Sequence, residues 1–238
     1  MSNKILAVIP ARSGSKSIKN KNLLKINNQT LISIAVKKAV KSKLFDKVII
    51  STDSMIYAKE AIKAGAEMLE LRPKNLSGGK ITLALVLKDL LTKFISKGEF
   101  FDDIISLQPT SPFLTVNSIK KSVELFYKKA ATGVATISKI NDFHPLTAQK
   151  IAKDGKISFL TKPKNIKNLF PRQKRPSAYK FTGGLYLRKS QNILNYKGDG
   201  WALGKKSYGL IVPSREASDI NYPEDLHMIK YYKKTNNF

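Results

Sequence analysis

The sequence predicts an α/β fold in which a mainly parallel sheet lies between two helix layers, as a three-layer α/β/α sandwich. Short runs of β-branched residues alternate with amphipathic segments of helix length, which is the pattern of such sheets. A tight loop of small residues follows the first run, as is common where a strand leads into a ligand-binding turn. The 238 residues, 42% of them hydrophobic, suit one domain spanning residues 1–238.

The first part of the chain alternates between the two patterns. β-Branched apolar runs predict strands, and apolar residues that recur every three or four positions predict helices. The predicted elements, in order, are strand 5–9, helix 30–41, strand 47–51, helix 55–64, short strand 68–71, helix 82–96, strand 103–107, helix 117–129 and strand 133–140. The segment Thr52-Asp53-Ser54 offers an N-cap to the second helix, and Gly65 is a suitable stop for it.

Regularity weakens over residues 141–180, where four prolines interrupt the chain and Asp154-Gly155 predicts a hairpin turn. We expect this stretch to leave the sheet as a long loop, a lid or an oligomerisation arm. Strand patterns return at residues 182–188 and 207–212, and residues 222–234 predict a closing helix.

The formal net charge of +26 is large, but its composition argues against a nucleic-acid surface. Only six of the 43 basic residues are arginines, and the lysines are spread over nearly every predicted helix. A surface that reads bases more often concentrates arginines and aromatic residues on one face. We therefore expect no nucleic-acid partner, although the positive field should concentrate anionic substrates.

Cysteine is absent, which excludes disulfides, thiolate metal sites and a cysteine nucleophile. The N-terminal apolar run is too short for a secretory signal, and no run approaches the roughly 18 residues of a membrane span. We expect a cytoplasmic protein with no membrane partner.

The loop after the first predicted strand has the composition of a phosphate-binding site. Its segment is Ala11-Arg12-Ser13-Gly14-Ser15-Lys16, and Lys21 follows shortly. Backbone N–H groups of small residues can point at phosphate oxygens, and Arg and Lys add charge-assisted hydrogen bonds. The spacing matches neither the P-loop nor the dinucleotide-binding pattern. An ordinary turn with solvated charges is the alternative.

Several segments together resemble the acylneuraminate cytidylyltransferases, the CMP-sialic acid synthetases and their relatives. They are IPARSGSKSIKNKNL, IISTDS, LRPKNLS, SLQPTSPF, FHPL, PRQKRPSAYKFTGGLYL and SDINYPEDL, in family order along nearly the whole chain. The resemblance implies a Rossmann-like nucleotidyltransferase fold that transfers CMP from CTP to the anomeric hydroxyl of a sialic-like nonulosonic acid. It also implies pyrophosphate release, Mg²⁺, a role in polysaccharide biosynthesis, and a homodimer formed through residues 141–180.

The resemblance also assigns roles to residues. Arg12, Lys16 and Lys21 would be catalytic and hold the triphosphate. The nucleotide-binding set would be Ala11, Arg12, Ser13, Gly14, Ser15, Lys16, Asn22, Arg72 and Thr82. Gln108, His144, Lys180 and Tyr186 would bind the small acidic sugar, and Asp219 with Asn221 would bind Mg²⁺. Read alone, His144 is as well explained as a structural residue, and residues 219–225 as the start of a helix.

The sequence departs from the family pattern mainly on the metal and acceptor sides. Gly79, Leu114, Lys180, Thr182 and Asn221 stand where the family usually has Asp, Arg, Arg, Asn and Asp. Three alternatives therefore stay open. They are a nucleotidyltransferase for another small acceptor such as KDO, a nucleotide-binding homologue with impaired catalysis, and a nucleic-acid binder.

Overall fold

A computed structural model describes residues 3–15, 17–161, 171–198 and 200–234. Its centre is a six-stranded sheet with the strand order β10-β6-β9-β5-β1-β4. The strands are β1 (Ile5–Pro10), β4 (Lys47–Ser51), β5 (Asp103–Leu107), β6 (Gly133–Lys139), β9 (Tyr179–Lys189) and β10 (Ser207–Ile211). The pairs β1–β4, β1–β5 and β10–β6 are parallel, and β9 runs antiparallel to both β5 and β6. The predicted mainly parallel sheet is confirmed.

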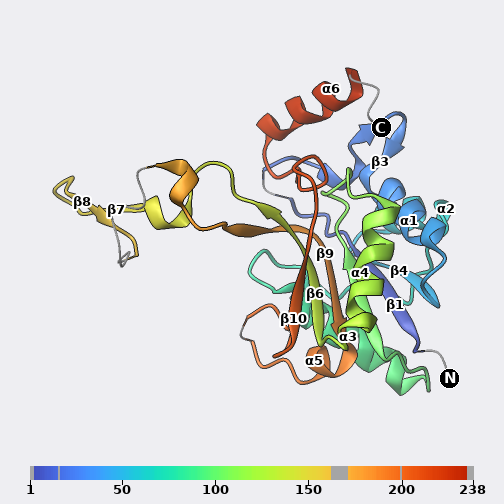
Figure 1. Cartoon of the computed structure of the whole chain (residues 1–238). Helices are drawn as coiled ribbons and strands as arrows, with labels where there is room; N and C mark the ends of the chain where they lie inside the picture. The colour runs from blue at the N-terminus through green and yellow to red at the C-terminus, as the bar shows by residue number, and fades with distance from the viewer. Residues whose placement is uncertain (1–2, 16, 162–170, 199, 235–238) are drawn as a thin grey trace.

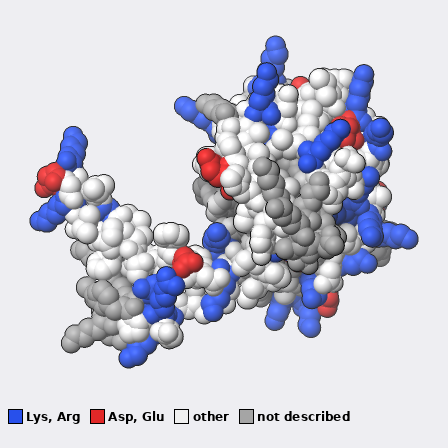
Figure 2. All heavy atoms as spheres, turned by 90° about the horizontal axis from the view of Figure 1, so that it is seen from above, with Lys and Arg blue, Asp and Glu red and all other residues white. Residues whose placement is uncertain are grey.

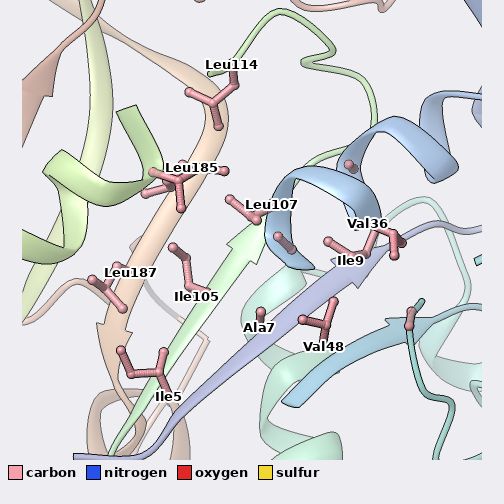
Figure 3. Close-up of a cluster of buried hydrophobic side chains, with 14 of the residues drawn as sticks. Ile5, Ala7, Ile9, Val36, Val48, Ile105, Leu107, Leu114, Leu185 and Leu187 are labelled. Atoms are coloured by element: carbon pink, nitrogen blue, oxygen red, sulfur yellow. The ribbon is translucent and has the colours of Figure 1, made fainter. Parts of the chain in front are cut away.

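Helices cover both faces of this sheet (Figure 1). The helices are α1 (Leu31–Ser42), α2 (Met55–Lys63), α3 (Leu83–Ser96), α4 (Val116–Lys128), α5 (Ser190–Leu194) and α6 (Leu226–Lys234). On one face, β1 residues such as Ile5 and Ile9 pack with α1, α2 and α4. The close-up of this core shows Ile9 beside Val36 of α1 (Figure 3). On the other face, Leu6 and Val8 pack against α3 and α5. Successive residues of β1 thus enter opposite cores, which explains its uninterrupted apolar sequence.

Side-chain caps set the helix starts. The hydroxyl of Thr30 accepts from the backbone N–H of Ser33 (3.1 Å), and Thr115 caps α4 in the same way through Ser118 N–H (3.1 Å). Ser54 caps α2, as the sequence predicted. The helices predicted to start at residues 30, 55, 82 and 117 therefore begin within one residue of those positions. The closing helix, predicted over residues 222–234, begins only at Leu226, because a 3₁₀ turn over Pro223–Asp225 precedes it.

The predicted strand 68–71 is wrong. Only Glu67 bridges to the sheet, opposite Ile49 of β4, and the chain then turns away until the Arg72 N–H reaches the carbonyl of Thr52 (2.7 Å). β4 is consequently an edge strand, because one bridge does not make a ladder. The sequence analysis also missed small elements: β2 (Lys25–Ile26), β3 (Gln29–Thr30), α5, and the 3₁₀ turns η1 (Lys21–Leu23), η2 (Lys74–Leu76), η3 (Pro145–Thr147), η5 (Arg172–Lys174) and η6 (Pro223–Asp225).

The described part of residues 141–180 projects from the body as an arm (Figure 1). The predicted hairpin is present as β7 (Gln149–Ile151) paired with β8 (Ile157–Phe159). Residues 162–170 lie outside the described part of the chain. The arm exposes Phe143, Ile151 and Ile157, which are 97%, 74% and 65% accessible. Large apolar side chains in such positions are typical of an interaction surface.

The surface view shows Lys and Arg side chains scattered over the body and the arm of the face it displays, with no single patch (Figure 2). This distribution on that face matches the solvated lysines expected from the sequence. Within the described residues, every helix is too short or too polar to cross a bilayer.

The core face of α4 should be a main source of stability. Phe126 is a buried residue of α4. Its substitution by Ala should lower the free energy of unfolding by about 3–5 kcal/mol, because apolar burial is lost and a cavity forms. Phe100, which is 63% exposed, is the matched control, and Phe100→Ala should cost less than about 1 kcal/mol. Urea unfolding measures both, and equal effects would contradict this placement of the core.

Candidate active site

A cavity of about 670 Å³ opens at the carboxyl ends of β1 and β5. Six segments meet there: the loop after β1, the start of α3, the loop after β5, the second half of β9, the stretch that holds Tyr196 and Trp201, and residues 219–221. The lining residues are Pro10, Arg12, Ser15, Lys21, Asn22, Thr82, Leu83, Ala84, Gln108, Pro109, Thr110, Gly183, Tyr186, Arg188, Tyr196, Gly200, Trp201, Asp219 and Asn221. Its position is the one expected for a ligand site in a sheet of this kind.

Asp53 holds the loop after β1 in place. Its carboxylate accepts from the Ser13 N–H (2.7 Å) and from the Ser13 hydroxyl (2.9 Å). The Asn22 amide donates to the carbonyl of Arg12 (3.3 Å), and the Ala11 N–H donates to the carbonyl of Ser51 (2.9 Å). From the sequence, Asp53 was expected only as part of the helix start at residues 52–54. Ser13 and Asp53 are 40 residues apart in the sequence, so no local sequence pattern predicts this contact.

The loop presents two described cations to the cavity, Arg12 and Lys21. Lys16 lies outside the described residues. Burial lowers the pKa of Lys21, and the nearby Asp219 partly opposes that shift. Gly79 lies beside the Arg12 guanidinium, since a Cβ there would be 3.5 Å from Nη1. With glycine at position 79, no carboxylate from that position neutralises Arg12.

Arg72 and Thr82 differ in how directly they meet the cavity. Thr82 precedes α3 and lines the cavity together with the first residues of that helix. Arg72 is not among the lining residues. It donates to the carbonyl of Ser51 (2.5 Å) and to the Ser51 hydroxyl (3.2 Å), and burial lowers its pKa to about 10. In this arrangement Arg72 braces the end of β4.

Residues 219–221 form the opposite wall from the loop. Asp219 accepts from the amide of Asn221 (2.9 Å) and from the hydroxyl of Ser111 (3.4 Å). The Lys21 ammonium lies 3.5 Å from Asn221 Oδ1, and the Ser17 hydroxyl donates to the Asn221 carbonyl (2.5 Å). These contacts join the two walls of the cavity.

The oxygen atoms at this wall fit a magnesium ion that is also bound by phosphate groups. Asp219 supplies one carboxylate and Asn221 one amide oxygen, whereas Asp225 is engaged by the backbone N–H groups of Asn221 and Tyr222 (2.7 and 2.8 Å). The described residues contain no cluster of three His, Asp or Glu side chains suited to a metal. Mg²⁺ is commonly held by one or two carboxylates with phosphate oxygens and waters.

The other side of the cavity is aromatic. Gln108 lies at the end of β5, and Tyr186 of β9 faces the same cavity. The Tyr186 and Trp201 rings stack nearly parallel, with centroids 5.6 Å apart. Burial raises the pKa of Tyr186. Arg188 and Trp201 also line the cavity and were not predicted from the sequence. Alternation along β9 places Arg188 on the same face as Tyr186, a period-of-two signal that was available in the sequence.

His144 and Lys180 do not line this cavity. His144 lies at the base of the arm, where Nδ1 accepts from the Leu146 N–H (3.3 Å) and Nε2 donates to the Pro176 carbonyl (3.0 Å). Both ring nitrogens thus bind backbone of the same chain. Lys180 lines a neighbouring cavity that shares Asp219 and Asn221 with the first.

Comparisons with known proteins identify the family of this chain. The family model described as Cytidylyltransferase matches residues 6–199. The chain is 32% identical to CMP-N,N'-diacetyllegionaminic acid synthase of Legionella pneumophila, over 82% of each chain. It is 26% identical to pseudaminic acid cytidylyltransferase of Campylobacter jejuni, over 98% of this chain and 97% of the relative.

A shorter match covers 53% of this chain and 29% of N-acylneuraminate cytidylyltransferase of Escherichia coli, at 38% identity. Among solved structures, a CMP:2-keto-3-deoxy-manno-octonic acid synthetase complexed with CTP has a TM-score of 0.71 at 16% identity, covering 98% and 99% of the two chains. That likeness shows the shared fold. The extent of the family match, together with the legionaminic acid synthase relative, shows that the chain belongs to the cytidylyltransferase family.

Proposed function

We propose that this enzyme transfers CMP from CTP to the anomeric hydroxyl of a sialic-like nonulosonic acid and releases pyrophosphate. The observation that carries the proposal is a single cavity that joins two kinds of wall. Arg12 and Lys21 of the loop, together with Asp219 of the wall that faces it, form the charged part of the cavity, which suits a triphosphate with its metal. Gln108 and Tyr186 form a second wall suited to a sugar. The relatives named above carry names of CMP-nonulosonic acid synthases, which supports this acceptor class.

The charged part of the cavity would stabilise the reaction by electrostatics. Negative charge on the phosphates rearranges as the α-phosphorus passes from the pyrophosphate oxygen to the sugar oxygen. Arg12 and Lys21 would bind phosphate oxygens, and the loop backbone over residues 13–15 would line them. The Asp53 clamp on Ser13 holds the loop before the nucleotide arrives, so less ordering entropy is lost on binding.

Asp219 and Asn221 would hold Mg²⁺ together with phosphate oxygens, and the ion would neutralise phosphate charge there. Because the side chain of Asn221 is an uncharged amide, Asp219 is the one charged ligand that residues 219–221 would contribute. The acceptor carboxylate would lie near this wall, where Lys180 lines the adjoining cavity.

The arm supports a homodimer as the assembled form. Its exposed Phe143, Ile151 and Ile157 would be covered by a second copy. His144, with its ring held by backbone, would then stiffen the base of the arm. Arg172 and Arg175, which line a small cavity beside His144, would reach toward the partner's site. We place the enzyme in the cytoplasm, where CTP is available, with a role in polysaccharide biosynthesis.

A pyrophosphate-release assay tests the reaction. The protein is supplied with CTP, Mg²⁺ and a panel of nonulosonic acids, with KDO included. Pyrophosphate release with a nonulosonic acid supports the proposal. Release only with KDO would show that the acceptor is KDO and not a nonulosonic acid of the sialic type. CTP binding without any pyrophosphate release would favour a catalytically impaired homologue. That alternative is considered because residues 219–221 carry only one carboxylate for binding Mg²⁺.

Arg12→Ala should lower kcat/KM about 10²–10³-fold, because it removes a cation from the developing phosphate charge. Lys25→Ala removes an exposed lysine outside the cavity and is the matched control, which should stay near wild type. Steady-state rates and thermal melts measure both variants. Equal rates in the two variants would show that the loop is not the phosphate site.

Asp53→Ala should raise the KM for CTP about 10-fold or more while changing kcat less, because the loop would lose its clamp but keep its cations. Ser54→Ala, which removes the neighbouring helix cap, is the control for a general loss of stability. If both variants change the melting temperature alike and neither changes the KM for CTP, the clamp has no part in binding.

Asn221→Asp should lower the Mg²⁺ concentration at half-maximal rate, because a second carboxylate would join Asp219 in binding the ion. Titration of Mg²⁺ at saturating CTP measures it, and chelation by EDTA should abolish turnover in both proteins. An unchanged Mg²⁺ dependence would remove residue 221 from the metal site.

A further inference from the structure

We propose that Arg188 determines which acceptors the enzyme takes, by donating a hydrogen bond to the carbonyl oxygen of an acyl substituent at the end of the sugar away from the reacting hydroxyl. The inference rests on the proposed function and extends it to one part of the substrate. It depends on the position of Arg188, its charge and its surroundings.

The position of Arg188 is deep in the cavity. In the β5–β9 ladder, Tyr186 lies opposite Ser106 and Arg188 lies opposite Ile104. The guanidinium contacts the Ser106 hydroxyl (3.3 Å), two residues before Gln108 at the edge of the sheet. At a rise of about 3.3 Å per residue, it lies about 7 Å below that edge. The phosphate loop follows β1, on the far side of β5, so Arg188 belongs to the acceptor side.

The charge of Arg188 is buried without an acidic partner among the described residues. Arg188 is only 3% exposed, and burial lowers the pKa of its guanidinium to about 10. Nε donates to the carbonyl of Trp201 (2.9 Å), and Nη1 reaches Ser106 and the carbonyl of Tyr186 (3.5 Å). Within the described chain, Nη2 has no hydrogen-bond partner. A buried cation of this kind is costly unless a ligand supplies an oxygen.

The surroundings of Arg188 suit a short apolar group that carries one oxygen. The Tyr186 ring lies 4.7 Å from the guanidinium, and Trp201 stacks on that ring. Leu83 and Ala84 of α3 line the same cavity. An acyl group carries its carbonyl oxygen and its alkyl carbon on the same carbon atom. The carboxylate bonded to the reacting carbon would stay at the sheet edge near Asp219, so it is not the group that Arg188 meets.

The test uses two acceptors that differ only by an acylamido group or a hydroxyl at the same carbon. For wild type, kcat/KM should favour the acylated acceptor. Arg188→Met keeps the side-chain bulk and removes the charge, and it should reduce that preference about 10- to 100-fold. The KM for CTP should stay within about twofold, since phosphate binding lies elsewhere. Arg188→Lys keeps a charge without the planar fork and should retain part of the preference.

Equilibrium binding of both acceptors to the CTP complex without Mg²⁺ supplies a readout independent of turnover. An equal loss on both acceptors would overturn the proposal and leave Arg188 a structural residue. Asp199 lies outside the described residues, so Asp199→Asn is assayed in parallel. If it reproduces the Arg188→Met result, an internal ion pair replaces the ligand contact and the proposal fails. Absence of turnover in wild type with every acceptor would instead refute the proposed function.

Discussion

The antiparallel strand β9 is the constraint on which the rest of this structure depends. It lies between β5 and β6 and pairs with both, so it joins the two parallel parts of the sheet. Its first residues come directly from the arm, and its central residues Gly183 and Tyr186 line the cavity. Because its alternate residues Leu185 and Leu187 are anchored in the core beneath α1 and α4, its other face is held rigidly toward the cavity. One strand thus connects the fold, the site and the arm.

The two walls of the cavity are organised by different physical means. The loop after β1 depends on polar contacts with distant residues, above all the Asp53 carboxylate on Ser13. The wall at residues 219–221 is tied to the loop after β5, where the Ile220 N–H donates to the carbonyl of Thr110 (2.8 Å). Positive charge is concentrated at the first wall, and Asp219 provides negative charge at the second. Such an arrangement favours a polyanion that brings its own cation.

The cost of burying Arg188 gives this part of the cavity a different character. Three of its contacts are with backbone carbonyls or a hydroxyl, and these fix the orientation of the guanidinium without neutralising it. The stacked rings of Tyr186 and Trp201 lie beside the guanidinium. A polar group in such a setting discriminates strongly, since a ligand that fails to pair with it leaves a buried donor unsatisfied.

The sequence by itself determined the alternation of elements, most of their boundaries and the loop after β1, because period-of-two and period-of-3.6 patterns and capping residues are local signals. It could not place residues 68–71, since a short apolar run does not show whether a neighbouring strand will pair with it. The tertiary structure alone decided that Asp53 holds Ser13, that Arg72 braces Ser51, and that Lys180 and His144 lie outside the main cavity of their own chain. It also brought Arg188 and Trp201 together. These outcomes depend on contacts between residues far apart in sequence, which are set by strand order and register and leave no mark on the residues nearby.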